Sequence, residues 1–156
     1  GFPLEGEAEL FERLSLEIFQ AGLSWLLVLK KRETMRVAFD VFDVDTVAAY
    51  GEADKERLVN DAGIIRNRLK IASIIENARR IQGLRESNGG FAAWIDAHHP
   101  LTLEEWVKLF RKTFKFTGPE VVNEFLMSIG YLPGGHRADC PVFAQIAAQN
   151  PPWMTD

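Results

Sequence analysis

Residues 61–66 read Asp61-Ala62-Gly63-Ile64-Ile65-Arg66 and separate two segments with helical periodicity, 54–60 and 67–82. A tight hairpin that contains glycine leaves backbone N–H groups unpaired at the start of the second helix, where they and the helix dipole can bind a phosphate. The pattern fits a helix-hairpin-helix clamp on a DNA backbone, and it also fits an ordinary pair of antiparallel helices, which is the commoner arrangement. The candidate backbone contacts are Gly63, Ile64, Ile65, Arg66, Arg68 and Lys70.

Helical periodicity continues along almost the whole chain, with short connections and no convincing alternating strand. We therefore predict an all-α fold in a single domain, residues 1–156. The predicted helices cover residues 7–21, 25–39, 46–50, 54–60, 67–82, 91–97, 103–112, 119–129 and 142–148. Ser24 and Asp45 are expected to cap two of them, and Asp54 to begin a third. The apolar side of the helix after Ser24 is predicted to carry Leu26, Leu29 and Val37.

Composition narrows the class of protein. A chain of 156 residues that is 47% hydrophobic can bury a sizeable core in one domain, and no apolar run approaches the length of a membrane span. A lone cysteine, Cys140, excludes an internal disulfide framework and favours a reducing, cytoplasmic compartment. The net charge of -4 argues mildly against a nucleic-acid partner. That acidic excess is local to residues 1–20, however, and residues 61–82 form a basic spot.

One acid lies where an apolar residue is expected. At roughly 100° per residue, Glu17 falls about 20° from Leu10 on the apolar face of the segment 7–21. A carboxylate in such surroundings pays a desolvation penalty unless it is hydrogen-bonded or meets positive charge. Glu17 is thus either a functional group in a cleft or a buried acceptor for backbone amides.

A glycine turn follows that helix and leads to Trp25. An indole face and the Glu17 carboxylate could line one pocket, which would suit a planar ring that carries positive charge. The alternative is that Trp25 is an ordinary core aromatic at a helix start. Further along, His136 and Cys140 are spaced as half of a tetrahedral zinc site, but the chain offers no obvious set of four ligands of the usual kinds.

Taken together, these residues resemble the 3-methyladenine DNA glycosylase I family, bacterial helix-hairpin-helix enzymes that excise alkylated adenine. The likeness is close over residues 10–78 and weaker at 114–118 and 136–140. It is carried by Leu16-Glu17, Gln20-Ala21-Gly22-Leu23-Ser24-Trp25, Val28-Leu29-Lys30-Lys31-Arg32-Glu33, Arg57-Leu58-Val59, Asp61-Ala62-Gly63-Ile64-Ile65-Arg66, Arg68, Lys70-Ile71 and Asn77-Ala78.

The resemblance implies an all-α helix-hairpin-helix glycosylase fold and a role for each motif. Glu17 would be the essential acid of the base pocket, Trp25 an aromatic wall of that pocket, and the turn at 61–66 the hairpin that holds the DNA backbone. His136 and Cys140 match two of the four ligands of a structural zinc site. The other two ligands and a tyrosine that stacks on the base belong to a segment expected before Gly1. Ile18, Phe19 and Leu69 depart from the family pattern, so the pocket is expected to differ in size.

The expected reaction is hydrolysis of the N-glycosidic bond of 3-methyladenine in double-stranded DNA, after the damaged nucleotide has rotated out of the duplex. We expect the protein to be a monomer. We also expect it to leave the DNA strand uncut, because no lysine is clearly placed as an amine nucleophile. Gly22 and Leu23 are the candidate wedge that fills the vacated space. Two alternatives stay open: a non-catalytic helix-hairpin-helix module that binds DNA, and a helical protein-interaction domain.

Overall fold

The computed structural model describes residues 6–133, and within that range the chain forms helices and no strand. The helices in chain order are α1 (Glu7–Gln20), α2 (Trp25–Ala38), the short 3-10 helix η1 (Asp40–Phe42), α3 (Val44–Ala48), α4 (Glu52–Val59), α5 (Arg68–Asn88), α6 (Phe91–His98), α7 (Leu103–Thr113) and α8 (Pro119–Ser128). The all-α prediction is confirmed. Across the described residues, no helix has the length and apolar character needed to cross a membrane.

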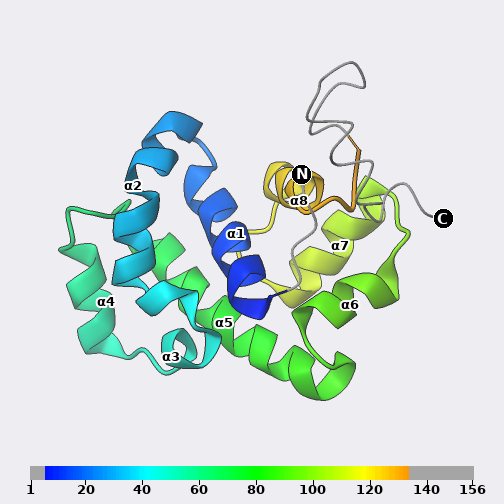
Figure 1. Cartoon of the computed structure of the whole chain (residues 1–156), viewed down its shortest axis with the longest axis horizontal. Helices are drawn as coiled ribbons and strands as arrows, with labels where there is room; N and C mark the ends of the chain where they lie inside the picture. The colour runs from blue at the N-terminus through cyan, green and yellow to red at the C-terminus, as the bar shows by residue number, and fades with distance from the viewer. Residues whose placement is uncertain (1–5, 134–156) are drawn as a thin grey trace.

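Two helices organise the rest. The α1 helix lies at the centre of Figure 1, with α2, α3 and α4 on one side and α6, α7 and α8 on the other. It contacts α2, η1, α3, α5, α6 and α8. The long α5 helix passes beneath it and contacts α3 and α4 on one side and α6 on the other. Glu17, near the C-terminal end of α1, is buried within this arrangement.

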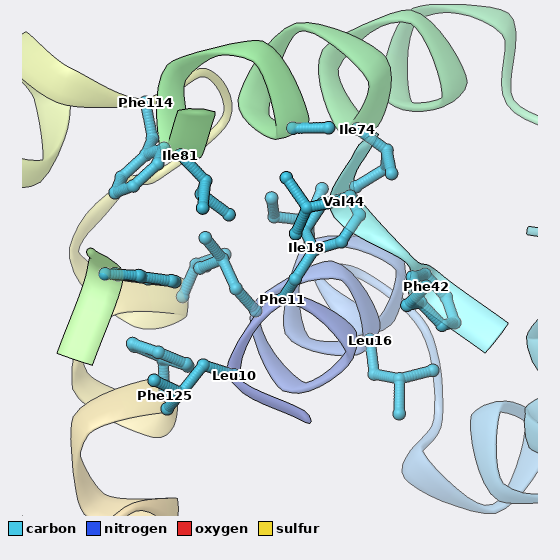
Figure 2. Packing of buried hydrophobic residues seen from close by; sticks show 14 of the residues in the cluster. Leu10, Phe11, Leu16, Ile18, Phe42, Val44, Ile74, Ile81, Phe114 and Phe125 are labelled. Atoms are coloured by element: carbon cyan, nitrogen blue, oxygen red, sulfur yellow. The ribbon is translucent and has the colours of Figure 1, made fainter. Parts of the chain in front are cut away.

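The central position of α1 follows from its apolar residues. Leu10, Phe11 and Ile18 are almost completely buried, and Figure 2 shows them among side chains of several other helices. The Phe11 ring meets Phe42 edge to face, with centroids 5.6 Å apart. Burying a side chain of this size contributes roughly 1.5–3 kcal/mol, so these contacts fix where α1 lies.

Several predicted helix ends are confirmed. The Ser24 hydroxyl accepts a hydrogen bond from Leu27 N at 3.2 Å and caps α2. The predicted starts at residues 103 and 119 also hold: Thr102 and Glu105 form a capping box before α7, and Pro119 opens α8. The predicted helix at 142–148 lies outside the described residues.

Two predicted caps were wrong. Asp43, and not Asp45, caps α3 by accepting from Thr46 N at 3.0 Å. The α4 helix begins at Glu52, and Asp54 is its third residue, whose carboxylate accepts from Gly51 N at 3.1 Å. Both errors have one cause: an aspartate can cap a helix from in front of it or reach back from its first turn, and the spacing does not distinguish the two.

The buried side of α2 was also predicted wrongly. Leu26, Leu29 and Val37 are 63%, 44% and 76% exposed, and the buried residues of α2 are instead Val28, Met35 and Ala38. Apolar residues occur all around this helix, so its periodicity does not select one face. The result is a set of exposed apolar side chains near the α1–α2 turn.

Candidate active site and DNA-backbone hairpin

Glu17 is buried near the C-terminal end of α1, with a relative exposure of 5%. This burial raises the pKa of its carboxyl from 4.5 to about 7; Arg13, one turn earlier, lowers that pKa, and Glu124 of α8 raises it. Because the side chain is almost completely excluded from solvent, water cannot solvate the charged form freely. Near neutral pH the carboxyl is thus balanced between its protonated and ionised states.

The Glu17 carboxylate has no hydrogen-bond or ion-pair partner among residues 6–133. Its neighbour Glu12 forms an ion pair with Arg36 at 2.9 Å. The structural role proposed from the sequence, an acceptor for backbone amides, therefore has no support in the described part of the chain. A buried carboxylate without partners is costly for folding and available to a ligand that donates hydrogen bonds or carries positive charge.

The turn after α1 presents its residues to solvent. Gly22 adopts φ +83°, a left-handed conformation that glycine tolerates best. Leu23 and Trp25 are 39% and 37% exposed. Leu26, in the first turn of α2, is exposed beside them in sequence. Glu17 and Trp25 thus lie on either side of one short turn.

The hairpin is tied to α2 by its backbone. The Lys31 ammonium donates to the carbonyls of Ala62 at 3.0 Å and Ile64 at 3.4 Å. The Thr34 hydroxyl donates to the Gly63 carbonyl in a short hydrogen bond. A Cβ on Gly63 would lie 3.0 Å from the Thr34 Cβ, so glycine permits this close approach.

The outer side of the hairpin keeps free donors. Asn67 caps α5 by accepting from Lys70 N at 3.1 Å. Within the described range, the amides of Ile65, Arg66, Arg68 and Leu69 donate to no protein acceptor. Unpaired amides at a helix start, together with the helix dipole, favour an anion such as phosphate. These free amides are the groups that the predicted backbone clamp would use, and the clamp itself stays a prediction.

The three basic residues predicted to reinforce that clamp have different surroundings. Arg66 is exposed and forms no ion pair within residues 6–133, whereas Arg68 pairs with Glu56 at 3.1 Å on the surface. Lys70 points elsewhere, because its ammonium donates to the carbonyls of Ala21 at 2.9 Å and Phe19 at 3.4 Å. It therefore joins the hairpin helix to the end of α1.

Lys31 and Thr34 were missed as functional residues in the sequence. Neither residue was predicted to contact the hairpin, whereas the structure turns both toward it. A usable signal was their spacing of three residues, which puts both on one side of a helix. Nothing in the sequence alone says that this side faces residues 61–64.

Two hollows in the described part of the chain are not lined by Glu17. One, of about 390 Å³, is lined by residues of α1 and α2 that include Glu12, Arg13, Leu16 and Arg36. Another, of about 440 Å³, lies between α2 and the hairpin and includes Thr34, Arg57 and Gly63. Neither is lined by Glu17 or Trp25, so the base pocket stays a prediction.

The predicted zinc ligands, His136 and Cys140, lie outside the described residues. Residues 6–133 contain no group of three or more His, Cys, Asp or Glu side chains that could hold a metal ion. The described residues therefore provide no test of the zinc prediction.

Comparison with known proteins identifies the family. Residues 1–107, more than half of the chain, match the methyladenine glycosylase family. This chain belongs to that family. DNA-3-methyladenine glycosylase 1 of Escherichia coli is 39% identical over 159 residues, covering 90% of this chain and 84% of the relative. The DNA-3-methyladenine glycosylase of Haemophilus influenzae is 33% identical over 160 residues, covering 90% and 86%.

Solved structures of the methyladenine glycosylases agree with this fold. One is a tyrosine-to-phenylalanine variant of 3-methyladenine DNA glycosylase I in complex with 3-methyladenine, with a TM-score of 0.83, 30% identity and coverage of 90% of this chain and 86% of that one. Another, the Staphylococcus aureus enzyme, has a TM-score of 0.80 and 29% identity, with coverage of 90% and 85%. The part of this chain matched to the family contains Glu17, the α1–α2 turn and the hairpin, whereas His136 and Cys140 lie beyond it.

Proposed function

We propose that this chain is a DNA-3-methyladenine glycosylase, which hydrolyses the bond between deoxyribose and 3-methyladenine in alkylated DNA. The observation that carries the proposal is the buried carboxylate of Glu17, which has no hydrogen-bond or ion-pair partner within residues 6–133, in a member of the methyladenine glycosylase family. Relatives that cover most of the chain are named for this activity. A non-catalytic DNA-binding module would have no use for such a costly acid.

The substrate must leave the duplex before it can meet Glu17. Rotating a nucleotide out of the stack costs a few kcal/mol, and the cost is least for a damaged base. The free amides of Ile65, Arg66, Arg68 and Leu69 and the exposed Arg66 side chain would hold a backbone phosphate during this step. Leu23 is the candidate side chain for filling the vacated space, because it is apolar and exposed and follows Gly22 in the turn.

Glu17 would then act by charge and hydrogen bonding. 3-Methyladenine in DNA is a cation, so a nearby carboxylate attracts it and ionises fully when the base is bound. The same negative charge stabilises the sugar as it becomes oxocarbenium-like. A cationic base is already a good leaving group, which lowers the need for a strong general acid. Lys31 and Lys70 donate to backbone carbonyls, which supports a monofunctional glycosylase without an amine nucleophile.

The partner proposed is double-stranded DNA that contains alkylated bases, bound by the chain as a monomer. We further propose that the protein binds a structural zinc ion, with His136 and Cys140 as two of its ligands. Thiolate and imidazole are the donors that zinc prefers. Metal content measured on the purified protein and on Cys140→Ser would test it.

The decisive experiment measures base release. The protein is incubated with methylated DNA, and released 3-methyladenine is quantified by chromatography for the wild type, Glu17→Gln and Glu12→Gln. Release by the wild type and Glu12→Gln, with loss in Glu17→Gln, is the expected result. Absence of release by the wild type would refute the activity, and undiminished release by Glu17→Gln would refute the role of the acid.

A further inference from the structure

The connection between α7 and α8, residues 114–118, is anchored from within the core. Phe114 is 2% exposed and packs against Phe91, with ring centroids 5.2 Å apart, and against Phe110 at 5.7 Å. Figure 2 shows Phe114 at the edge of the buried cluster, beside α5. Thr117 is 3% exposed. Between these two anchors, Lys115 and Phe116 are exposed to solvent.

A buried amide fixes the backbone of this loop. Asn77 of α5 is fully buried, and its side chain donates from Nδ2 to the Lys115 carbonyl at 3.2 Å and accepts at Oδ1 from Lys115 N at 2.8 Å. Arg80, one turn later on α5, donates to the Thr113 carbonyl at 3.2 Å. A buried amide that forms both bonds holds its partner in one position, because losing either bond leaves a polar group unsatisfied.

The held loop presents an aromatic ring to water. Phe116 adopts φ +58°, a left-handed conformation that is unusual for a bulky residue, and it is 49% exposed. A strained residue of this kind is costly for folding and persists only where its surroundings enforce it. Core packing does not account for Phe116, since about half of the residue is in solvent. The geometry instead suits a ring held ready for a partner.

The loop lies in line with the other candidate DNA contacts. Lys70 and Asn77 are seven residues apart on α5, which places them on the same side of that helix and about 10 Å apart along it. Lys70 contacts Ala21 at the α1–α2 turn, and Asn77 contacts the loop at Lys115. The hairpin precedes α5 directly. The hairpin, the turn and the loop therefore follow one another along one side of α5.

The charge around the ring favours a polyanion. Lys115 is exposed next to Phe116, and α7 ends on the exposed pair Arg111 and Lys112. The acid closest in sequence is Glu120, in the first turn of α8. An exposed aromatic among cations is the combination that stacks on bases or sugars while neighbouring phosphates are neutralised.

We propose that Phe116 and Lys115 form a second DNA contact, on the opposite side of the α1–α2 turn from the hairpin. Phe116 lies against the bases or sugars of the duplex beside the extruded nucleotide, and Lys115 pairs with an adjacent phosphate. This contact rests on the proposed glycosylase function. It grips the duplex and does not line the base pocket, so it affects DNA affinity and leaves affinity for the free base unchanged.

The test compares variants in binding to a labelled duplex that carries an abasic-site analogue, by fluorescence anisotropy. Phe116→Ala is expected to bind about 10-fold more weakly than the wild type, in line with the loss of one aromatic contact. Phe116→Tyr is expected to bind like the wild type. Lys115→Ala is expected to reduce the slope of log affinity against log salt by about 0.9, the value for one phosphate contact. Binding of free 3-methyladenine is measured alongside and is expected to be unchanged in all three variants.

The matched control is Leu103→Ala, which truncates another exposed apolar residue at the far end of α7. It is expected to bind DNA like the wild type. Phe116→Ala binding within twofold of the wild type overturns the proposal, and so does an equal loss of affinity for the free base, which would place Phe116 in the pocket. Should Phe116→Ala fail to fold, the salt slope of Lys115→Ala decides. If the wild type neither binds methylated DNA nor releases 3-methyladenine from it, the proposed glycosylase function is refuted. That result is distinguishable from a wild type that is active and a Phe116→Ala variant that binds DNA normally.

Discussion

The acidic residues at the two ends of α1 differ in their ion pairs and their burial. In the N-terminal half, Glu7 pairs with Arg85 of α5, and Glu12 pairs with Arg36 of α2 at 2.9 Å. In the last turn, Glu17 is more deeply buried than either acid and has no partner among the described residues. The first half of the helix therefore uses its acids to attach neighbouring helices, whereas the acid of the last turn forms no ion pair within residues 6–133.

The difference has an energetic cost that folding alone does not explain. A pKa raised from 4.5 to about 7 means that ionising Glu17 costs the folded state about 3 kcal/mol at and above neutral pH. A neighbouring arginine placed as Arg36 is for Glu12 would remove much of that cost. A cationic base would remove it as well, but only while it is bound.

The largest effect is expected from Glu17→Gln. Loss of the carboxylate should reduce 3-methyladenine release at least 100-fold, because the amide offers the cationic base no charge. The same change should raise the free energy of unfolding by about 1–3 kcal/mol at pH 8, since the buried charge is gone. Chromatographic release assays and urea unfolding at pH 8 measure the two quantities.

Glu12→Gln, in the N-terminal half of α1, is the matched control for Glu17→Gln. It should lower the free energy of unfolding by about 1 kcal/mol, because it breaks the pair with Arg36, and it should leave base release close to wild type. If Glu12→Gln impairs release as much as Glu17→Gln does, the contrast between the two ends of α1 has no functional meaning.

Next in size is the dependence on pH. Excision requires ionised Glu17, so kcat/KM should fall about 10-fold for each pH unit below the pKa of about 7 and level off above it. Stability should run the other way: the folded state holds the proton that the unfolded state loses, so the free energy of unfolding falls as pH rises from 4.5 to about 7. Rate and unfolding profiles of the wild type and Glu17→Gln test both trends. A wild-type rate that stays constant down to pH 5 would contradict the assignment.

The sequence predicted the helices better than it predicted what their faces contact. Helical periodicity and caps located α1, α7 and α8 closely, and Glu17 stood out because a charged residue interrupted an apolar face. The exposed face of α2 could not be predicted, because Leu26, Leu29 and Val37 satisfy the same periodicity as the residues that are buried. Which of two apolar faces is covered depends on neighbours that are distant in the chain.

Long-range contacts explain the other differences. Lys70 has the charge and position of a phosphate ligand, and only the fold shows that it meets the end of α1. Asn77 belongs to the residues that carry the family resemblance, but the sequence does not show that it holds the backbone of a loop 38 residues away. From the sequence alone, a polar side chain near a hairpin could bind a ligand or hold the protein backbone, and only its partners in the fold distinguish these two roles.

Lys70 leads to the third prediction, which concerns how the last turn of α1 is held. Lys70→Met removes the donor to the Phe19 and Ala21 carbonyls, so the end of the helix and Glu17 should shift, and base release should fall about 10-fold. Lys70→Arg should restore part of the rate. The salt dependence of DNA binding should stay unchanged in Lys70→Met, whereas Arg66→Ala should reduce its slope by about 0.9. A reduced slope in Lys70→Met would return Lys70 to the phosphate contacts.

The smallest effect is expected where α1 is attached by ion pairs. Arg36 contacts Glu12 and also Glu33 at 3.2 Å, and its side chain is 32% exposed, so water screens part of the attraction. Arg36→Met keeps most of the aliphatic stem and should cost about 1 kcal/mol or less in the free energy of unfolding, with base release unchanged. Urea unfolding at low and high salt measures it, and the difference from wild type should shrink as salt rises. A loss of base release in Arg36→Met without a loss of stability would show that the Arg36 charge affects Glu17 in the last turn of α1. The ion pairs at one end of the helix would then be coupled electrostatically to the acid at the other end.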